Sequence, residues 1–262
     1  MTSRRIRRKR AGRVGDLHLC VDVSPPSRGA EPGAPPRPST EAGTPVDSTS
    51  RGSSRFKLQM AAQPKRLWPP GSTLRVAFLG GDSEVHQRVA AVAGEWTQHA
   101  NIGFEFGHAA ADIRIAFAHG PSWSAVGTEA RDVRFKNRPT MNLGWLTPDA
   151  PEVEYRRVVL HEFGHALGCV HEHNSPAAGI SWRREAAYAY FGGPPNFWSR
   201  PQVDANVFMR YSALNTNHTS FDRESIMVYA IPPQLTEDGF SIDWNSELSL
   251  TDIAFIARCY PR

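Results

Sequence analysis

Four short stretches of the chain alternate apolar and polar residues, which is typical of β-strands with one buried face. TLRVAFLGG (73–81) alternates and then stops at two glycines. ADIRIAFAHG (111–120) places Ile113, Ile115 and Phe117 on one face. We expect strands at 73–81, 102–107, 111–120 and 140–145.

Four other stretches carry apolar residues at the spacing of an amphipathic helix. Asp82 is placed to cap the first of them, and Ser181 is the candidate cap of the third. Gly168 is expected to end the second, because glycine readily adopts the positive φ that closes a helix. The apolar face of the first consists of Val85, Val89, Val92 and Trp96. We expect helices at 82–100, 152–168, 181–191 and 250–260.

This order of elements predicts one α/β domain with a mixed sheet over residues 65–262, which is long enough to bury a core of its own. Residues 1–64 differ in composition. They hold eight Pro, eight Ser and six Gly but one aromatic residue, and twelve basic against five acidic residues. A segment this poor in apolar residues cannot offset its ordering entropy, so we expect a disordered tail. The tail carries a net charge of +7. Because the whole chain carries +4, the domain carries −3.

The charge run RRIRRKR (4–10) is most simply a solvated charged tail, and nucleic acid or an anionic membrane is an alternative partner for it. No apolar segment long enough for a secretory signal or a transmembrane helix is present, so the cytoplasm is the default expectation. The three cysteines, Cys20, Cys169 and Cys259, do not form the pattern of a disulfide framework. We expect a monomer.

HEFGHALGCVHEH (161–173) places four of the ten histidines within thirteen positions. On a helix, residues four apart lie on one face, so His161 and His165 present two imidazoles to one point. A bend at Gly168 then allows His171 to approach from outside the helix. Three protein nitrogens with an open fourth position are typical of a catalytic zinc site, and zinc is the default metal for three imidazoles.

Glu162 lies between the first two histidines and is suited to act as general base for a zinc-bound water. His173 is an alternative third ligand, although the spacing from Gly168 favours His171. Glu185 is a more distant alternative. The sequence therefore predicts a catalytic zinc site, with Glu162 as general base for a zinc-activated water.

HEFGHALGCVH matches the HExxHxxGxxH signature of the metzincin zinc peptidases, and Glu172 directly after it resembles the astacin branch. SWSAVG (122–127) is similar to a segment that astacins place before the active-site helix. FDRESIMVY (221–229) resembles the Met-turn, and LSLTDIAFIARCYP (248–261) resembles the closing helix. The resemblance covers most of residues 65–262.

The resemblance implies a zinc-dependent metalloendopeptidase that hydrolyses peptide bonds in polypeptides. It also implies a twisted five-stranded sheet, a long active-site helix and a smaller irregular lower half across a cleft. The fifth strand comes from the resemblance, because the pattern gives four. TMNLGW (140–145) stands where metzincins keep the edge strand that binds an extended substrate. Met227 would lie beneath the metal as an apolar floor, and Tyr229 would lie near the zinc as an extra ligand or as a donor to the oxyanion.

The sequence departs from the astacin pattern at several positions. Val228 replaces the usual histidine, and Ser122 stands where a cysteine is expected. FLGGD (78–82) is superficially similar to the astacin zymogen motif, but its place between a strand and a helix favours a helix cap. Cys20 is an alternative thiolate plug for the zinc, although nothing around it supports this role. A protein that binds peptides without cutting them is a rival reading, and its mark would be loss of Glu162.

Overall fold

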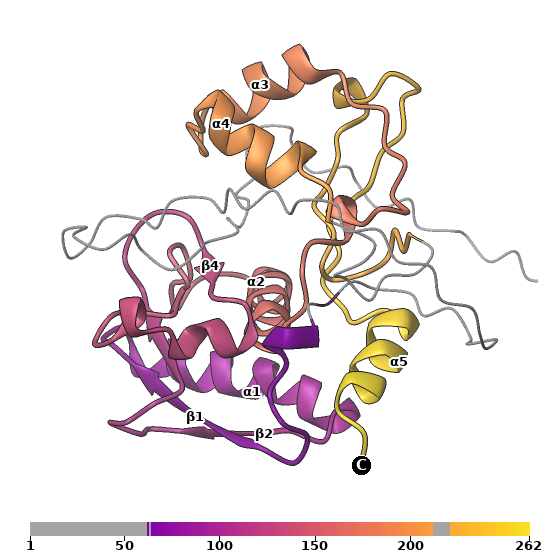
Figure 1. The fold of residues 1–262 in the computed structure, drawn as a ribbon. Helices are drawn as coiled ribbons and strands as arrows, with labels where there is room; N and C mark the ends of the chain where they lie inside the picture. Colours follow the sequence, from indigo (N-terminus) through magenta and orange to yellow (C-terminus); the bar gives the residue numbers. More distant parts are fainter. Residues whose placement is uncertain (1–61, 63, 212–220) are drawn as a thin grey trace, which may run out of the picture.

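The computed structural model describes residues 62, 64–211 and 221–262. The predicted tail, its basic run and Cys20 therefore lie outside the described residues, apart from Ala62 and Pro64. Figure 1 shows two lobes. The larger lobe contains the sheet, α1 and α2, and the smaller lobe carries α3 and α4. The segment 161–173 begins in the last turns of α2 and continues between the two lobes.

A mixed sheet with the strand order β2-β1-β3-β5-β4 forms the larger lobe within the described residues. β1 is parallel to β2 and β3, β3 is parallel to β5, and β4 is antiparallel to β5. The predicted α/β fold with a mixed five-stranded sheet is confirmed. The strands are β1 (Thr73–Phe78), β2 (Gly103–Phe106), β3 (Ile113–Ala116), β4 (Trp123–Ser124) and β5 (Met141–Asn142).

The prediction that TMNLGW (140–145) is the edge strand is wrong. Within that segment, β5 pairs with β3 on one side and with β4 on the other. The chain after β3 turns back, so that Trp123 pairs with Asn142 and Ser124 pairs with Met141. The antiparallel β4 is therefore the edge strand on this side of the sheet.

α1 (Ser83–His99) and α2 (Glu152–Ala166) pack against each other over the sheet. Asp82 caps α1 as predicted, because its side chain accepts a hydrogen bond from the Glu84 N–H at 2.7 Å. The predicted apolar face of α1 is buried, and its Trp96 donates from Nε1 to the Leu160 carbonyl of α2 at 3.0 Å. This contact fixes the helix that carries the histidines.

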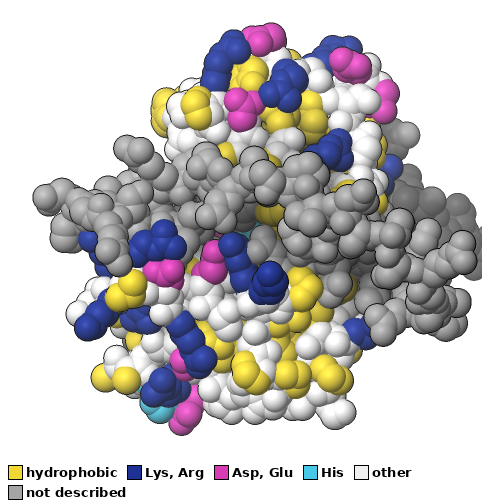
Figure 2. Space-filling model, viewed as in Figure 1, with side chains coloured by type: hydrophobic (Ala, Val, Ile, Leu, Met, Phe, Trp, Pro, Cys, Tyr) yellow, Lys and Arg dark blue, Asp and Glu magenta, His cyan; other side chains and the backbone are white. Residues whose placement is uncertain are grey.

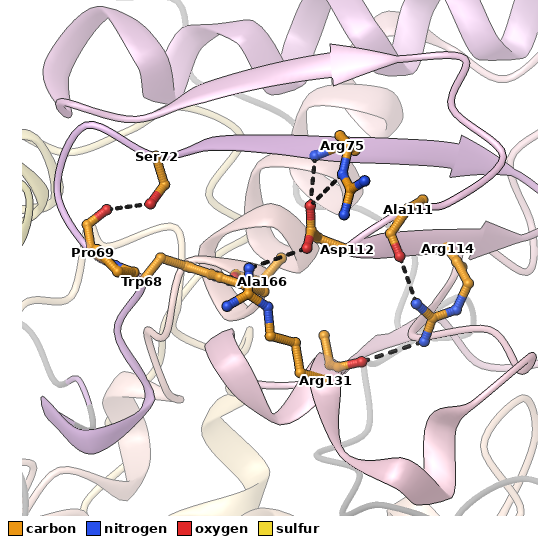
Figure 3. A network of polar contacts seen from close by, with 10 residues as sticks. Trp68, Pro69, Ser72, Arg75, Ala111, Asp112, Arg114, Arg131 and Ala166 are labelled. Atoms are coloured by element: carbon orange, nitrogen blue, oxygen red, sulfur yellow. Dashed lines mark hydrogen bonds and ion pairs between the residues drawn. The ribbon is translucent and has the colours of Figure 1, made fainter.

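A polar network braces the loops near the C-terminal end of α2 (Figure 3). The Asp112 carboxylate accepts hydrogen bonds from Arg75 and Arg131, and the Arg131 guanidinium stacks on the Trp68 ring. Burial alone would raise the pKa of Asp112, but the hydrogen bonds from Arg75 and Arg131 outweigh this effect and lower the pKa below its ordinary value. Trp68 in turn donates from Nε1 to the Ala166 carbonyl of α2 at 2.7 Å. The network thus connects the sheet to the last turn of α2.

The smaller lobe contains α3 (Arg184–Gly192) and α4 (Arg200–Val203), and α5 (Leu250–Cys259) packs against α1. The prediction that Ser181 caps the third helix is wrong, because α3 begins at Arg184 with Arg183 as its N-cap. The Ser181 carbonyl instead accepts the Glu237 N–H at 2.8 Å, and Trp182 pairs with Thr236. A tertiary contact therefore holds this segment extended.

Short helical turns connect the longer elements. Four of them precede or follow α2: η1 (Pro64–Arg66), η2 (Gly127–Arg131), η3 (Val133–Phe135) and η4 (Glu172–Asn174). In the smaller lobe, the π-helical turn η5 (Asp204–Phe208) continues α4, and η6 (Pro233–Leu235) follows the Met-turn. Within the described residues, no helix combines the length and the apolar character that crossing a membrane requires.

Candidate metal centre

His161 and His165 lie one turn apart on α2, and both side chains are buried. Their Nε2 atoms are 3.1 Å apart. This is the arrangement expected from residues four apart on one helical face.

The end of α2 has the geometry of a Schellman motif. The Gly168 N–H donates to the His165 carbonyl at 2.7 Å, and the Cys169 N–H donates to the Gly164 carbonyl at 3.0 Å. Gly168 has a φ of +95°, and a Cβ added there would lie 2.8 Å from Leu67 Cδ2. The predicted role of Gly168 is confirmed, because its positive φ is a backbone conformation that favours glycine.

His171 follows this bend and returns to the helix. Its Nε2 lies 3.2 Å from the Nε2 atoms of both His161 and His165. Among the described residues, these three form the one group of His, Cys, Asp or Glu side chains placed to hold a metal ion. The structure thus brings together the three histidines that the spacing selected.

The imidazole tautomers fit a metal ion at this point. The Nδ1 atoms of His161 and His165 lie 2.8 Å and 2.9 Å from the carbonyl oxygens of Ile226 and Cys169. Because a carbonyl can only accept, each Nδ1 carries the proton and each Nε2 presents a lone pair to the centre of the group. A tetrahedral ion with Zn–N bonds of about 2.0–2.1 Å separates its ligands by about 3.3–3.4 Å, close to the distances found.

The alternative third ligands have other partners. The Nε2 of His173 bonds to the Asn206 carbonyl at 2.9 Å. Glu185 is exposed on α3 and forms an ion pair with Arg200 at 2.5 Å. Neither belongs to the metal-binding group, so the structure selects His171.

The Met-turn forms the floor of the site. Met227 is fully buried, and a Cβ added to Gly164 on α2 would lie 2.4 Å from its Sδ. The Met227 carbonyl accepts the Glu172 N–H at 3.0 Å, directly after His171 in sequence. The same turn therefore packs under α2 and fixes the chain that carries the third histidine.

The two remaining predicted residues flank the three histidines. Glu162 is fully buried on α2 next to His161. Tyr229 is also buried, and its ring centroid lies 4.3 Å from that of His171 and 6.3 Å from that of His161. Tyr229 and His161 also line a hollow between α2, the Met-turn and the segment before α5, whose other lining residues are Arg157, Ile226, Val228, Trp244 and Asn245.

Sequence reasoning missed the residues that hold the histidines from outside the helix. The carbonyl groups of Ile226 and Cys169 accept from two of the histidines. Trp68 donates to the last turn of α2, and the buried Asp252 bonds the Met-turn. A backbone carbonyl leaves no mark on residue type, so no sequence signal identifies the first two. Asp252 carries a weak signal, because Ser249 and Asp252 have the spacing of a capping box.

Solved structures of known proteins resemble this one. One of them is a structure of myroilysin, to which this chain is 43% identical with a TM-score of 0.74. The match covers 98% of the myroilysin chain and 77% of this chain. Over 94% of a second myroilysin structure and 96% of this chain, the identity is 34% and the TM-score is 0.64. No protein-family model and no curated protein matches the chain.

A more distant neighbour is high choriolytic enzyme 1, a hatching enzyme zinc-protease from the medaka fish Oryzias latipes. It is 16% identical, with a TM-score of 0.52 over 75% of this chain and 95% of the enzyme, which is a likeness of fold. Four findings agree with the signature at 161–171. They are the convergent histidines, the glycine bend, the buried Met-turn and the match to myroilysin. The chain belongs to the metzincin zinc metallopeptidases, in their astacin-like branch.

Proposed function

We propose that the protein is a zinc-dependent endopeptidase that hydrolyses peptide bonds within polypeptides. The observation that carries this proposal is the convergence of three Nε2 atoms to within 3.1–3.2 Å of one another. Lone pairs this close repel one another unless a cation lies between them, and the donor set matches the preference of zinc.

In this proposal, His161, His165 and His171 hold Zn²⁺ as neutral imidazoles. Bound zinc supplies a Lewis acid that acidifies a water molecule and polarises the scissile carbonyl. Glu162 accepts the proton of the attacking water on its carboxylate and delivers it to the departing amine. Tyr229 donates its hydroxyl hydrogen to the oxygen on which negative charge develops. The position of its ring between His171 and His173 supports this role.

The substrate backbone is proposed to bind along β4. β4 is the outer strand of the described sheet, and it packs against the active-site helix α2. An extended polypeptide can add to such an edge through main-chain hydrogen bonds, without a demand on its side chains. This assignment moves the substrate strand from 140–145 to Trp123–Ser124.

Residues 65–262 are proposed as the catalytic domain and 1–64 as a tail, although Ala62 near the end of the tail pairs with Cys169 and is buried in the core of the domain. Packing around α2 supports the domain assignment. Trp68, near the start of the domain, donates to the Ala166 carbonyl at 2.7 Å, and Tyr260, near the end of the domain, donates to the Leu167 carbonyl at 2.6 Å.

Figure 2 shows basic and acidic side chains interspersed on both lobes of the face in view. Ion pairs such as Arg184–Asp204 account for part of this mixture. A polypeptide is the proposed partner of the domain, because the proposed reaction cleaves peptide bonds.

The test replaces Glu162 with Gln, which keeps its shape and removes its basicity, and with Ala. Loss of a general base lowers the cleavage rate by about 10²–10⁴-fold. Both variants should still bind one equivalent of zinc, measured by metal analysis after gel filtration. Glu152→Gln in the exposed first turn of α2 is the matched control and should cleave at the wild-type rate. Cleavage by Glu162→Gln at the wild-type rate, or no zinc in the wild-type protein, would contradict the proposal.

A further inference from the structure

Asp252 is a fully buried carboxylate in the first turn of α5. It accepts hydrogen bonds from the Ser225 hydroxyl at 2.7 Å, the Ile226 N–H at 2.8 Å and the Ser249 N–H at 3.0 Å. The capping box of α5 accounts for the Ser249 bond alone. The other two donors belong to the Met-turn, so Asp252 does more than end a helix.

The bonds of Asp252 continue to the first histidine. The Ser225 Oγ, whose hydrogen is donated to Asp252, accepts the Met227 N–H at 3.1 Å. That N–H belongs to the same peptide group as the Ile226 carbonyl, which accepts the His161 Nδ1–H at 2.8 Å. A continuous chain therefore runs from the Asp252 carboxylate through a hydroxyl and one peptide group to the His161 imidazole.

Every donor and acceptor in this chain points in the same sense, so each bond polarises the next. A hydroxyl that donates to a carboxylate is a better acceptor. A peptide group whose N–H is engaged has a more negative carbonyl oxygen. A histidine that donates its Nδ1–H to such an oxygen is a stronger ligand at Nε2 and is fixed in one ring orientation.

We propose that Asp252 is a positioning residue of the metal centre, which orients His161 and raises its strength as a ligand through the Ser225 hydroxyl and the Ile226–Met227 peptide group. This inference rests on the proposed zinc site. It assigns to Asp252 the role that a carboxylate plays when it contacts a ligating histidine directly. Here the carboxylate acts across two intervening groups from a helix 91 positions further along the chain.

The test compares zinc affinity in the full chain for Asp252→Asn, Ser225→Ala and the double variant. The apo proteins are titrated with zinc against a chromophoric chelator. Each single variant should raise the zinc dissociation constant by about 10–100-fold, the usual effect of losing an outer partner of a ligand. The double variant should be no weaker than the weaker single variant, because either change interrupts the same chain.

Ser249→Ala is the matched control. It removes the hydroxyl that caps the Asp252 N–H at 2.9 Å and leaves the Ser225–Asp252 bond in place. It should lower the melting temperature, as the loss of a cap does, and leave the zinc dissociation constant within twofold of wild type. If Asp252 were only a helix cap, Asp252→Asn would likewise lower the melting temperature and leave the zinc dissociation constant within twofold of wild type.

A spectroscopic readout separates orientation from stability. In the zinc-loaded proteins, the His161 Nδ1–H proton resonance should move upfield in Asp252→Asn and Ser225→Ala, because its hydrogen bond weakens. The His165 Nδ1–H donates to Cys169 and lies outside the chain, so its resonance should stay unchanged as an internal control.

The proposal is overturned if both single variants keep wild-type zinc affinity and an unmoved His161 resonance. Ser225→Ala carries this decision alone if Asp252→Asn does not fold. Failure of the wild-type protein to bind zinc would instead overturn the proposed function, and this inference with it.

Discussion

Replacing Gly164 with Ala tests whether the Met-turn is a packed floor under the histidines. Gly164 lies on α2 between His161 and His165. An added Cβ would lie 2.4 Å from Met227 Sδ and 3.2 Å from Trp96 Cζ2, and both of these side chains are fully buried. The extra methyl group therefore displaces Met227 or α2.

Two effects of opposite sign set the magnitude. Alanine is favoured over glycine inside a helix by about 1 kcal/mol. Overpacking a filled core costs about 1–3 kcal/mol. Gly164→Ala should thus lower the free energy of unfolding by about 0–2 kcal/mol. Gly94→Ala on α1 has the same helix benefit, but its Cβ meets no atom within 4 Å. That variant should be stabilised by about 1 kcal/mol.

The assay is urea unfolding of both variants under identical conditions. The difference between them isolates the packing effect and should be about 1–3 kcal/mol. Gly164→Ala should also bind zinc more weakly, because a displaced Met227 moves the neighbouring Ile226 carbonyl that holds His161. If Gly164→Ala is as stable as Gly94→Ala and binds zinc normally, Met227 does not support the site in this way.

Three further outcomes are expected. Trp68→Phe leaves the buried Ala166 carbonyl without its 2.7 Å donor and should lower the free energy of unfolding by about 1–3 kcal/mol in urea unfolding. Tyr229→Phe should lower kcat by about 10²-fold with little change in KM in steady-state peptide cleavage, and an unchanged kcat would remove the tyrosine from the mechanism. Burial raises the pKa of Asp252 from 3.8 to about 6, so the folded state binds this proton more tightly than the unfolded state does. Protonated Asp252 therefore contributes about 3 kcal/mol to the free energy of unfolding below about pH 4, and this contribution is lost as the pH rises through about 6. Unfolding of the metal-free wild type and of Asp252→Asn, compared from pH 4 to 7, measures it.

Local patterns predicted the parts of the structure that depend on near neighbours. The i, i+4 spacing placed His161 and His165 together, and the glycine at 168 marked the bend. Strand positions followed from alternation, and Asp82 capped α1 as expected. Each of these features is decided within a few residues, where helix geometry and backbone conformation leave little choice.

The errors and omissions involve contacts between distant segments. β4 has two residues, too few to show alternation, so the pattern did not reveal it. The resemblance therefore placed 140–145 at the sheet edge, where the structure has β4. Ser181 has a good capping residue type, but pairing of its neighbour Trp182 with Thr236 keeps the segment extended. The hydrogen bond from His161 to Ile226 spans 65 positions and ends on a backbone atom, so residue type does not reveal it.

X-ray absorption at the zinc K edge counts the imidazole ligands of the bound zinc. The full chain is loaded with one equivalent of zinc and compared with His171→Ala and, as a control, His173→Ala. We expect three imidazole nitrogens at about 2.0–2.1 Å in the wild type, three in His173→Ala and two in His171→Ala. A wild-type spectrum without three imidazoles, or one that His171→Ala leaves unchanged, would contradict it.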